Sequence, residues 1–333
     1  MYPLLNQFKI PFFFLYIFVS FYIEASESQD SLKIGFGSCL DQDNPQEIWQ
    51  PLKKENLHAF VFMGDNVYGD SDSGELIQMQ IAYTKQKQRL PRWLKNLNPL
   101  AIWDDHDYGL NDGGGDYILK KDSQKLFLDF WKVKEEDPRR NQEGIYFSEN
   151  KNLKDKKILI LGLDTRYFRS PLVGEKRNYI ATTDTSTTIL GEEQWEWLES
   201  KFQKETDLII LVSSIQILAT NHGFEKWSNF PHEKERLLSL IKESKKPVIL
   251  VSGDRHKGAI YKQDNLYELT TSSLNKPLPG WLETIWKETD PLILGTMHYN
   301  MNYGVIRIES SGVISVELKG KEGEILQKAS LKI

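Results

Sequence analysis

Six residues that can ligate a metal ion follow short apolar runs of the sequence, and a tyrosine stands close to one of them. They are Cys39, Asp65, Asp105, His106, Asp254 and His256, with Tyr68 three residues after Asp65. In open α/β sheets, side chains beyond the carboxyl ends of the strands collect in one cleft. A thiolate, a phenolate, several carboxylates and an imidazole crowded together would repel one another or stay unpaired, and a bound cation removes that conflict. The pattern therefore predicts a metal site.

An aspartate that follows a strand also has an ordinary role, as a turn residue or as the N-cap of the next helix. The run Ile158 to Leu163, for example, ends in Asp164. The same arrangement recurs five times along the chain if Cys39 is included. This repetition favours the metal interpretation over a series of unrelated turns.

Three short motifs add a resemblance to a known family. They are Gly64 to Asp70 (GDNVYGD), Trp103 to Asp107 (WDDHD) and Gly253 to His256 (GDRH). They resemble the GDxxY, GN-H-(D/E) and GHxH motifs of metallophosphoesterases, with Asp105 and Asp254 in place of an asparagine and a histidine. These replacements, and Gly37-Ser38-Cys39 where the superfamily has DxH, are similar to the PhoD-type alkaline phosphatases. The resemblance extends from about residue 33 to residue 318.

The resemblance implies an α/β fold, a four-layer α/β/β/α sandwich with mixed sheets, like that of purple acid phosphatases. It also implies two or more metal ions. The residues expected around an Fe(III) ion are Cys39, Asp65, Tyr68, Asp254 and His256. Asp65 and Asp105 are expected at a second ion, for which Ca(II) is the first choice and other divalent metals are alternatives. Asn111 or Asn302 is expected to supply a further oxygen ligand.

The function implied is hydrolysis of phosphoric esters. Two cations roughly 3 to 4 Å apart polarise phosphoryl oxygens and lower the pKa of a bridging water, so that hydroxide is available for in-line attack on phosphorus. His106 is expected to contact the phosphate or to protonate the leaving group. Arg166, Arg169 or Arg255 is expected to bind phosphate oxygens. The sequence leaves open a monoester or a diester, and a small molecule, a lipid headgroup or a cell-wall polymer.

Two other classes of function remain as alternatives. A binding or scaffolding protein would keep the fold and the metals without turnover; loss of His106 or His256 would favour it, and both are present. A serine or cysteine hydrolase would use Ser38 or Cys39 with a histidine, but the chain has no GxSxG elbow. Sensitivity to a chelator separates the metal-dependent hydrolase from the last alternative.

The elements expected to position these residues alternate between strand and helix over most of the chain. The predicted strands are Leu32–Gly37, Ala59–Met63, Leu100–Trp103, Ile158–Leu163, Val248–Ser252, Tyr267–Thr271, Tyr303–Glu309 and Val313–Leu318. The predicted helices are Glu75–Leu90, Ser123–Trp131, Glu192–Lys204 and Glu233–Glu243. The last strands follow one another without helices, so mixed sheets are expected around a βαβ body.

The N-terminal segment is expected to lie outside this fold. Ile10 to Ile23 is an uncharged apolar run followed by a small-residue site at Ala25. About 20 apolar residues are needed to span a bilayer, so the run predicts a signal peptide at residues 1–25, with an uncleaved membrane tether as the alternative. Residues 26–333 are then expected to form one metallophosphatase domain, secreted or periplasmic, without a permanent membrane span.

Composition excludes two further classes. The chain has 333 residues, a net charge of -5 and 27% charged residues without a run of one sign, so it lacks the footprint of a nucleic-acid-binding protein. Cys39 is the only cysteine, which excludes an intrachain disulfide framework and any multi-cysteine zinc or iron–sulfur site.

Overall fold

Two mixed six-stranded sheets form the centre of the protein. The computed structural model describes residues 30–279, 281 and 288–333. The first sheet has the strand order β14-β13-β12-β1-β2-β3 and the second the order β10-β11-β9-β8-β5-β4. A separate two-stranded hairpin is formed by β6 and β7. The strands of the first sheet are β1 (Ser31–Gly37), β2 (Ala59–Met63), β3 (Leu100–Ile102), β12 (Asn302–Glu309), β13 (Val313–Gly320) and β14 (Ile325–Lys332).

The second sheet and the hairpin come mainly from the middle of the chain. The strands of the second sheet are β4 (Phe147–Leu153), β5 (Lys156–Gly162), β8 (Leu208–Val212), β9 (Val248–Ser252), β10 (Gly258–Gln263) and β11 (Leu266–Thr271). The hairpin consists of β6 (Val173–Glu175) and β7 (Asn178–Ile180). Strands β5, β8, β9 and β11 are parallel, as are β1, β2 and β3. Their carboxyl ends are the places where the sequence predicts ligands.

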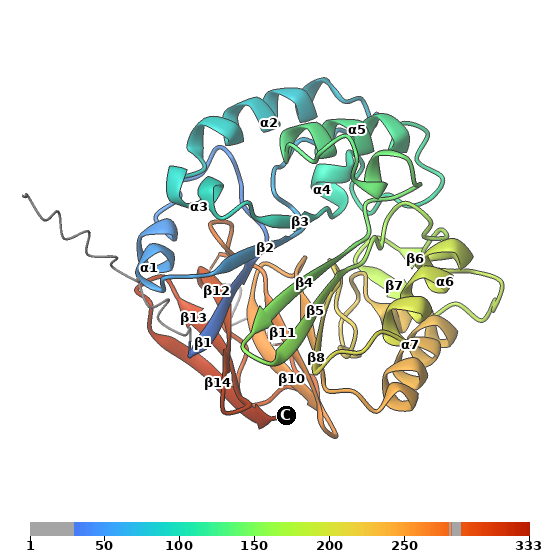
Figure 1. Cartoon of the computed structure of the whole chain (residues 1–333). Coiled ribbons are helices and arrows are strands. Elements are labelled where there is room, and N and C mark those ends of the chain that lie inside the picture. The colour runs from blue at the N-terminus through green and yellow to red at the C-terminus, as the bar shows by residue number, and fades with distance from the viewer. Residues whose placement is uncertain (1–29, 280, 282–287) are drawn as a thin grey trace, which may run out of the picture.

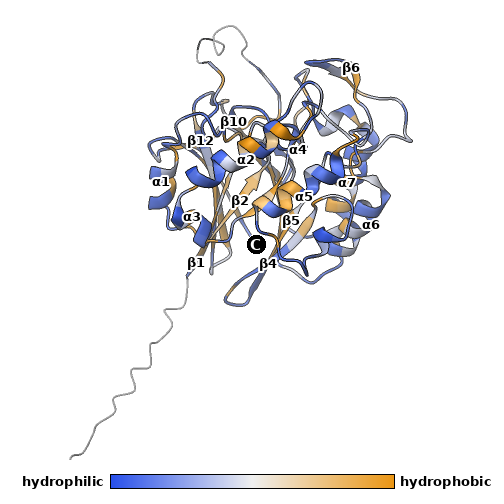
Figure 2. Cartoon of the chain, turned by 90° about the horizontal axis from the view of Figure 1, so that it is seen from above, coloured by the Kyte–Doolittle hydropathy of each residue, from blue (hydrophilic) through white to orange (hydrophobic). Residues whose placement is uncertain are grey.

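The helices form the two outer layers (Figure 1). Helices α1 to α5 lie over the first sheet, and α6 and α7 lie beside the second. They are α1 (Trp49–Lys54), α2 (Ile77–Arg89), α3 (Arg92–Asn96), α4 (Asp105–Tyr108), α5 (Lys120–Phe130), α6 (Gly191–Phe202) and α7 (Pro231–Ser244). In Figure 2 the visible sides of most of these helices are hydrophilic, whereas the strands between them are largely hydrophobic. The expected four-layer α/β/β/α arrangement is confirmed.

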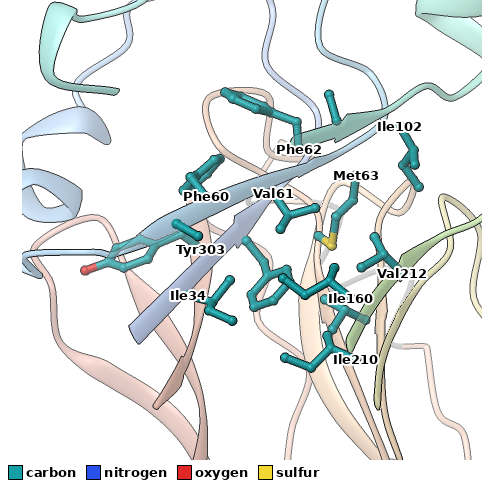
Figure 3. Packing of buried hydrophobic residues seen from close by; sticks show 14 of the residues in the cluster. Ile34, Phe60, Val61, Phe62, Met63, Ile102, Ile160, Ile210, Val212 and Tyr303 are labelled. Atoms are coloured by element: carbon teal, nitrogen blue, oxygen red, sulfur yellow. The ribbon is translucent and has the colours of Figure 1, made fainter. Parts of the chain in front are cut away.

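Alternation along the strands explains why both faces of the second sheet are covered. Ile158 and Ile160 of β5 belong to the core that includes the first sheet, whereas Leu159 and Leu161 belong to the core beneath α6 and α7. Successive side chains of a strand point to opposite faces. Figure 3 shows the packing between the sheets, where Ile34 and Val61 lie near Ile160 and Ile210.

The predicted elements are present, with boundaries that shift by a few residues, and several elements are additional. Strand β8 has the sequence LIILV and is completely buried, and such an apolar run is typical of a buried strand. Strands β4, β6, β7, β10 and β14 and the short helices α1, α3 and α4 are also additional to the predicted elements. The predicted leader, residues 1–25, lies outside the described residues. Within the part of the chain that the structure describes, no helix is both long enough and apolar enough to cross a membrane.

Candidate metal centre

The two sheets approach each other where their parallel strands end. Cys39, Asp65 and Asp105 follow β1, β2 and β3 of the first sheet, and Asp254 and His256 follow β9 of the second. Gly253 shows how close the two backbones are: a Cβ at this position would lie 2.6 Å from Ser38 Oγ and 2.9 Å from the carbonyl oxygen of Met63. A glycine is therefore required for the two sets of ligand candidates to share one site.

Four of these residues have a left-handed backbone conformation. The φ angles are +55° for Cys39, +51° for Asp65, +67° for Asp254 and +53° for His256. Residues other than glycine seldom adopt such angles, and each instance costs roughly 1–3 kcal/mol. Strain concentrated in this way is characteristic of functional sites. Here it turns side chains from both sheets toward a common point.

The first group of donors is formed by Cys39, Asp65 and His256, whose ligand atoms all lie within 4.8 Å of one another. The thiol of Cys39 lies 3.4 Å from Asp65 Oδ2 and 3.2 Å from Ser272 Oγ. Tyr68 donates its hydroxyl to Asp65 Oδ2 over 3.2 Å and lies 3.5 Å from His256 Nε2. The structure thus brings together four of the five residues expected at the ferric ion.

Asp254, the fifth, belongs to a second group. It lies with Asp104 and Asp105, and a third group consists of Asp65, Asp105 and His106. Asp104 was not predicted as a ligand, although it stands in the quoted WDDHD motif directly after β3. Its Oδ1 accepts hydrogen bonds of 2.6 Å from Arg166 and Ser214, while no hydrogen bond to its buried Oδ2 is found among the described residues.

Burial is the largest influence on the pKa values of these groups. It raises the pKa of the Cys39 thiol, with Asp65 adding to the effect, and likewise the pKa of the Tyr68 phenol. Burial also raises the pKa of Asp65 and of Asp254 above the usual carboxyl range. It lowers the pKa of His256 to about 4, which keeps that imidazole neutral and able to bind a metal.

His106 and Asp105 are shifted the opposite way. Burial acts against the charge on His106, but the carboxylates of Asp105, Asp65 and Asp70 outweigh it and raise the pKa of His106 well above its usual value. Burial also acts against ionised Asp105, yet the charges of His106 and Arg166 lower its pKa. At neutral pH the pair is therefore an imidazolium beside a carboxylate.

The donor set fits metal ions. Asp65 Oδ1 and Asp104 Oδ2 are buried atoms without a hydrogen-bond partner among the described residues. Buried carboxylate oxygens are costly without a partner, and a cation would supply one. A cation would also lower the pKa values of the thiol, the phenol and the carboxyls and so favour their ionised forms. Thiolate, carboxylate, phenolate and imidazole are all established classes of metal ligand.

Two residues orient the histidines. His106 Nδ1 lies 2.6 Å from Asp70 Oδ1, and His256 Nδ1 lies 2.5 Å from the carbonyl oxygen of Lys276. A partner on one ring nitrogen fixes the tautomer and directs the other nitrogen toward the site. Lys276 also places its ammonium 3.5 Å from the centre of the Tyr68 ring. Asp70 was within the GDNVYGD motif but was given no role, and nothing in the sequence marked Lys276.

A cavity of about 520 Å³ opens over the acidic groups. Asp105, His106, Asp254 and His256 line it, together with Asn111 and Arg255. His222 also faces the cavity, and burial lowers its pKa so that the ring is neutral.

The three arginines expected at the phosphate are placed differently. Arg255 faces the cavity, pairs with Glu288 over 2.7 Å and stacks on Phe224. Arg166 is completely buried behind the acids, where it pairs with Asp104 and Glu225, both over 2.5 Å. Arg169 is also buried and pairs with Glu225 over 3.1 Å. Of these three arginines, only Arg255 lines the cavity.

Two further residues serve the structure around the site. The Oδ1 of Asn302 accepts hydrogen bonds from Thr271 Oγ1 and from the amide of Ser272, over 3.0 and 3.1 Å, and so positions the serine that contacts Cys39. Asp164 lies outside the three groups of donors described for the structure. Its carboxylate accepts hydrogen bonds from the indole of Trp103 and from the amides of Ile145, Arg166 and Tyr167. Asp164 thus has the turn role.

The layered fold and the mixed set of donors at its sheet edges are those of a metallophosphoesterase. The family model described as PhoD-like phosphatase matches residues 35–322, and the chain belongs to that family. Phosphoester hydrolysis with metal ions is the chemistry that this family supports.

Solved structures share the fold. The structure of PhoD is 15% identical, with a TM-score of 0.68 over 91% of this chain and 68% of that chain. GAP50, the anchor in the inner membrane complex of Plasmodium, is 13% identical, with a TM-score of 0.61 over 92% of this chain and 90% of its own. Purple acid phosphatase PPD1 from yellow lupin (Lupinus luteus) seeds is 12% identical, with a TM-score of 0.57 over 91% of this chain and 54% of its own. No curated protein matches the sequence.

Proposed function

We propose that this protein is an exported metal-dependent hydrolase of phosphoric esters, acting as a phosphodiesterase, an alkaline phosphatase or both. The observation that carries the proposal is the convergence of buried donors from both sheets on the floor of a cavity that also holds His106 and Arg255. The donors need cations, and the cavity gives a substrate access to them. A site serving only to stabilise the fold would not need the open cavity.

Each residue has a specific task in this proposal. Cys39, Asp65, Tyr68 and His256 would hold one ion, and Asp104, Asp105 and Asp254 would hold another, with Asn111 at the cavity wall as a further oxygen ligand. When bound, such ions supply Lewis-acid polarisation of the phosphoryl oxygens and a water of lowered pKa. Iron is favoured at the first set because thiolate and phenolate are anionic donors suited to Fe(III), and calcium at the second because it prefers oxygen ligands.

The chain's own side chains complete the reaction. His106, held protonated by its neighbouring carboxylates, donates a proton to the leaving-group oxygen, and Asp70 fixes its ring. Arg255 donates to phosphate oxygens from the cavity wall, where its Nε has no hydrogen-bond partner among the described residues. Arg166, with no exposed surface, instead supports Asp104 from behind.

Hydrolysis of p-nitrophenyl phosphate and bis-p-nitrophenyl phosphate, with metal analysis of the purified protein, tests the proposal. We expect turnover of at least one ester, loss of turnover in a chelator and recovery when metal is restored. A metal-containing protein without turnover of either ester would favour the non-catalytic binding protein. Turnover insensitive to a chelator, and lost in Cys39→Ala, would favour a thiol hydrolase.

Export is a separate part of the proposal and rests on the apolar run Ile10 to Ile23 followed by Ala25. N-terminal sequencing of the protein secreted by its source should find the chain beginning near Ser26. Recovery of intact Met1 on protein held in the membrane fraction would instead establish a tether. Neither result affects the proposed chemistry.

A further inference from the structure

We propose that the β6–β7 hairpin forms an anion subsite, so that the substrate is an organic phosphoester carrying a second negative group away from the reacting phosphate. This inference rests on the proposed function and names the substrate class of the same site. It concerns Lys176 and Arg177, the two residues of the hairpin turn, which line the same cavity as the acidic groups.

The size of the cavity calls for a substrate larger than a phosphate group. About 520 Å³ falls in the range of roughly 300–1,000 Å³ typical of sites for small organic ligands. The cavity is also lined by the aromatic residues Phe224 and Tyr179, the latter in β7 of the hairpin. An organic group attached to the ester therefore has a surface on which to pack.

The hairpin is fixed in place at the cavity wall. Tyr179 of β7 donates its amide to the carbonyl oxygen of Gly223 over 2.8 Å and its hydroxyl to Asp112 Oδ2 over 2.9 Å. A Cβ at Gly223 would lie 2.2 Å from the carbonyl oxygen of Arg177, so the turn packs directly on this glycine. Figure 2 shows β6 at the margin of the molecule, apart from both sheets. The contacts hold the turn at the cavity rather than leaving it free in solvent.

The turn supplies the available positive charge of the cavity. The other cations that line it are paired: Arg255 and Lys257 with the carboxylate of Glu288, and protonated His106 with Asp70. Lys176 and Arg177 are exposed, and no ion pair of either is found among the described residues. A substrate's second anion would therefore meet its free counter-charge at the hairpin.

The backbone of the turn decides which substitution it tolerates. Arg177 has φ +67°, a left-handed position in a two-residue hairpin turn where glycine or asparagine is usual. Lys132, Lys154 and Lys245 share this conformation, and none of them lines the cavity. The left-handed backbone therefore guides the choice of a variant, and the case for the subsite rests on the position and the charge of the turn.

The test compares two esters that differ in one charge, 4-carboxyphenyl phosphate and 4-carbamoylphenyl phosphate, on the metal-loaded protein. The readout is the ratio of their kcat/KM values in wild type and in Lys176→Gln/Arg177→Asn. Leaving-group effects cancel because the same two esters are used with both proteins. Asparagine suits the left-handed turn, so the variant keeps the hairpin. We expect the preference for the anionic ester to fall about 5- to 30-fold, and to weaken in high salt.

A charge-matched control removes two lysines elsewhere. Lys132→Gln/Lys134→Gln makes the same change in net charge at exposed positions after α5, away from the cavity. We expect its preference to equal that of wild type. Equal preferences in wild type and in the hairpin variant would overturn the subsite, even if both esters are hydrolysed. An equal loss in the control would assign the effect to overall charge and would also overturn it.

Binding of the matching non-hydrolysable phosphonates separates this inference from the proposed function. The measured quantity is the ratio of the affinity for 4-carboxybenzylphosphonate to the affinity for 4-carbamoylbenzylphosphonate. This ratio should be about 5 to 30 times larger in wild type than in the hairpin variant. This difference in binding is expected even if neither ester is hydrolysed. Absence of hydrolysis would reject the proposed hydrolase and leave the subsite in place. No difference in binding would reject the subsite alone.

Discussion

In the contact between His106 and Asp70, His106 is the proposed proton donor and Asp70 orients its ring and raises its pKa. We expect His106→Ala to lower kcat by roughly 10² to 10⁴ with near-normal metal content, because a general acid contributes about that factor. Asp70→Asn should have a smaller effect and should move the alkaline limb of the kcat profile to lower pH, because the carboxylate raises the pKa of His106. Kinetics across pH, with metal analysis of each variant, measure both effects.

Metal content is the control for this pair. If His106→Ala loses metal together with activity, His106 is a ligand, as its grouping with Asp65 and Asp105 allows. If the variant keeps full activity, His106 has no part in the reaction. An unchanged pH profile in Asp70→Asn would remove Asp70 from the support of His106.

Cys39 and Tyr68 give a spectroscopic prediction. A thiolate and a phenolate bound to Fe(III) give charge-transfer absorption, which zinc and calcium do not. We expect a coloured protein whose band shifts or bleaches in Tyr68→Phe, and weaker iron retention in Cys39→Ser. The Cys39 thiol should resist iodoacetamide until metal is removed.

Two outcomes would contradict the iron assignment in different ways. A colourless, fully active protein containing only zinc would remove iron but leave a two-metal hydrolase. Full activity of the Cys39→Ala/Tyr68→Phe double variant would remove both residues as ligands.

At the residue level, the sequence predicts the metal-ligand candidates, because they stand in motifs. It does not predict which side chains reach the cavity, because that depends on burial. The ligand candidates after β1, β2, β3 and β9 do converge, because each directly follows a parallel strand. The arginines could not be separated in advance, since Arg166 and Arg255 each stand beside a strand-end acid but only Arg255 reaches the cavity. Lys276 contacts the site through its carbonyl oxygen, a group that every residue has.

At the level of elements, the sequence predicts where the strands lie along the chain better than it predicts which strands lie next to one another. Apolar runs predict β2 and β9, but nothing in either run shows that their ends meet across two sheets, since that depends on the backbone approach at Gly253. Strand β14 has an exposed and partly polar pattern at the sheet edge, so it lacks the apolar run that identifies buried strands. Helix α4 has only four residues and no room for a periodic pattern.

The turn after β5 gives the element-level prediction. Asp164 joins the end of β5 to the indole of Trp103, which follows β3 in the other sheet. Asp164→Ala would leave several buried donors unpaired, and we expect a loss of roughly 3–5 kcal/mol in the free energy of unfolding. Metal content per folded molecule should stay normal.

Urea denaturation and metal analysis measure these two quantities. Asp164→Asn is the matched control, since its amide oxygen still accepts hydrogen bonds, and we expect a smaller loss of stability. Loss of metal from folded Asp164→Ala would make Asp164 part of the site, against the turn role.

At the level of the whole molecule, the raised pKa values of buried acids predict an unusual pH dependence for the metal-free protein. Burial raises the pKa of Asp65 and Asp254, so these carboxyls keep their protons to a higher pH in the folded protein than in the unfolded chain. Stability conferred by such groups is present at low pH and is lost as pH rises through the folded pKa. Burial also raises the pKa of Asp107 to about 7, so we expect the free energy of unfolding to fall between pH 6.5 and 7.5.

Groups of opposite sign act mainly outside this pH window. Burial lowers the pKa values of His58, His222 and His256, and these residues favour folding mainly as pH rises toward the usual histidine value of about 6.5. Lys226 and Lys257, with pKa values lowered to about 8, act mainly above the window. Urea midpoints measured in a chelator test the prediction. Midpoints that rise with pH would contradict it, whereas the metal-loaded protein should not show the fall, because metal binding needs deprotonated ligands.

The meeting of two sheets at Gly253 gives bound ions a mechanical role as well. An ion shared by Cys39 and His256 would tie together positions separated by roughly 200 residues, and the chain-entropy treatment of such a tether gives about 5 kcal/mol. A chain with one cysteine has no disulfide to do this. Stripping the ions should therefore loosen the packing of one sheet on the other, seen as faster hydrogen exchange along β2 and β9 than along β13. The metal centre would then act as a reversible cross-link between the two sheets. Scarcity of metal would therefore limit the lifetime of the folded protein as well as its activity.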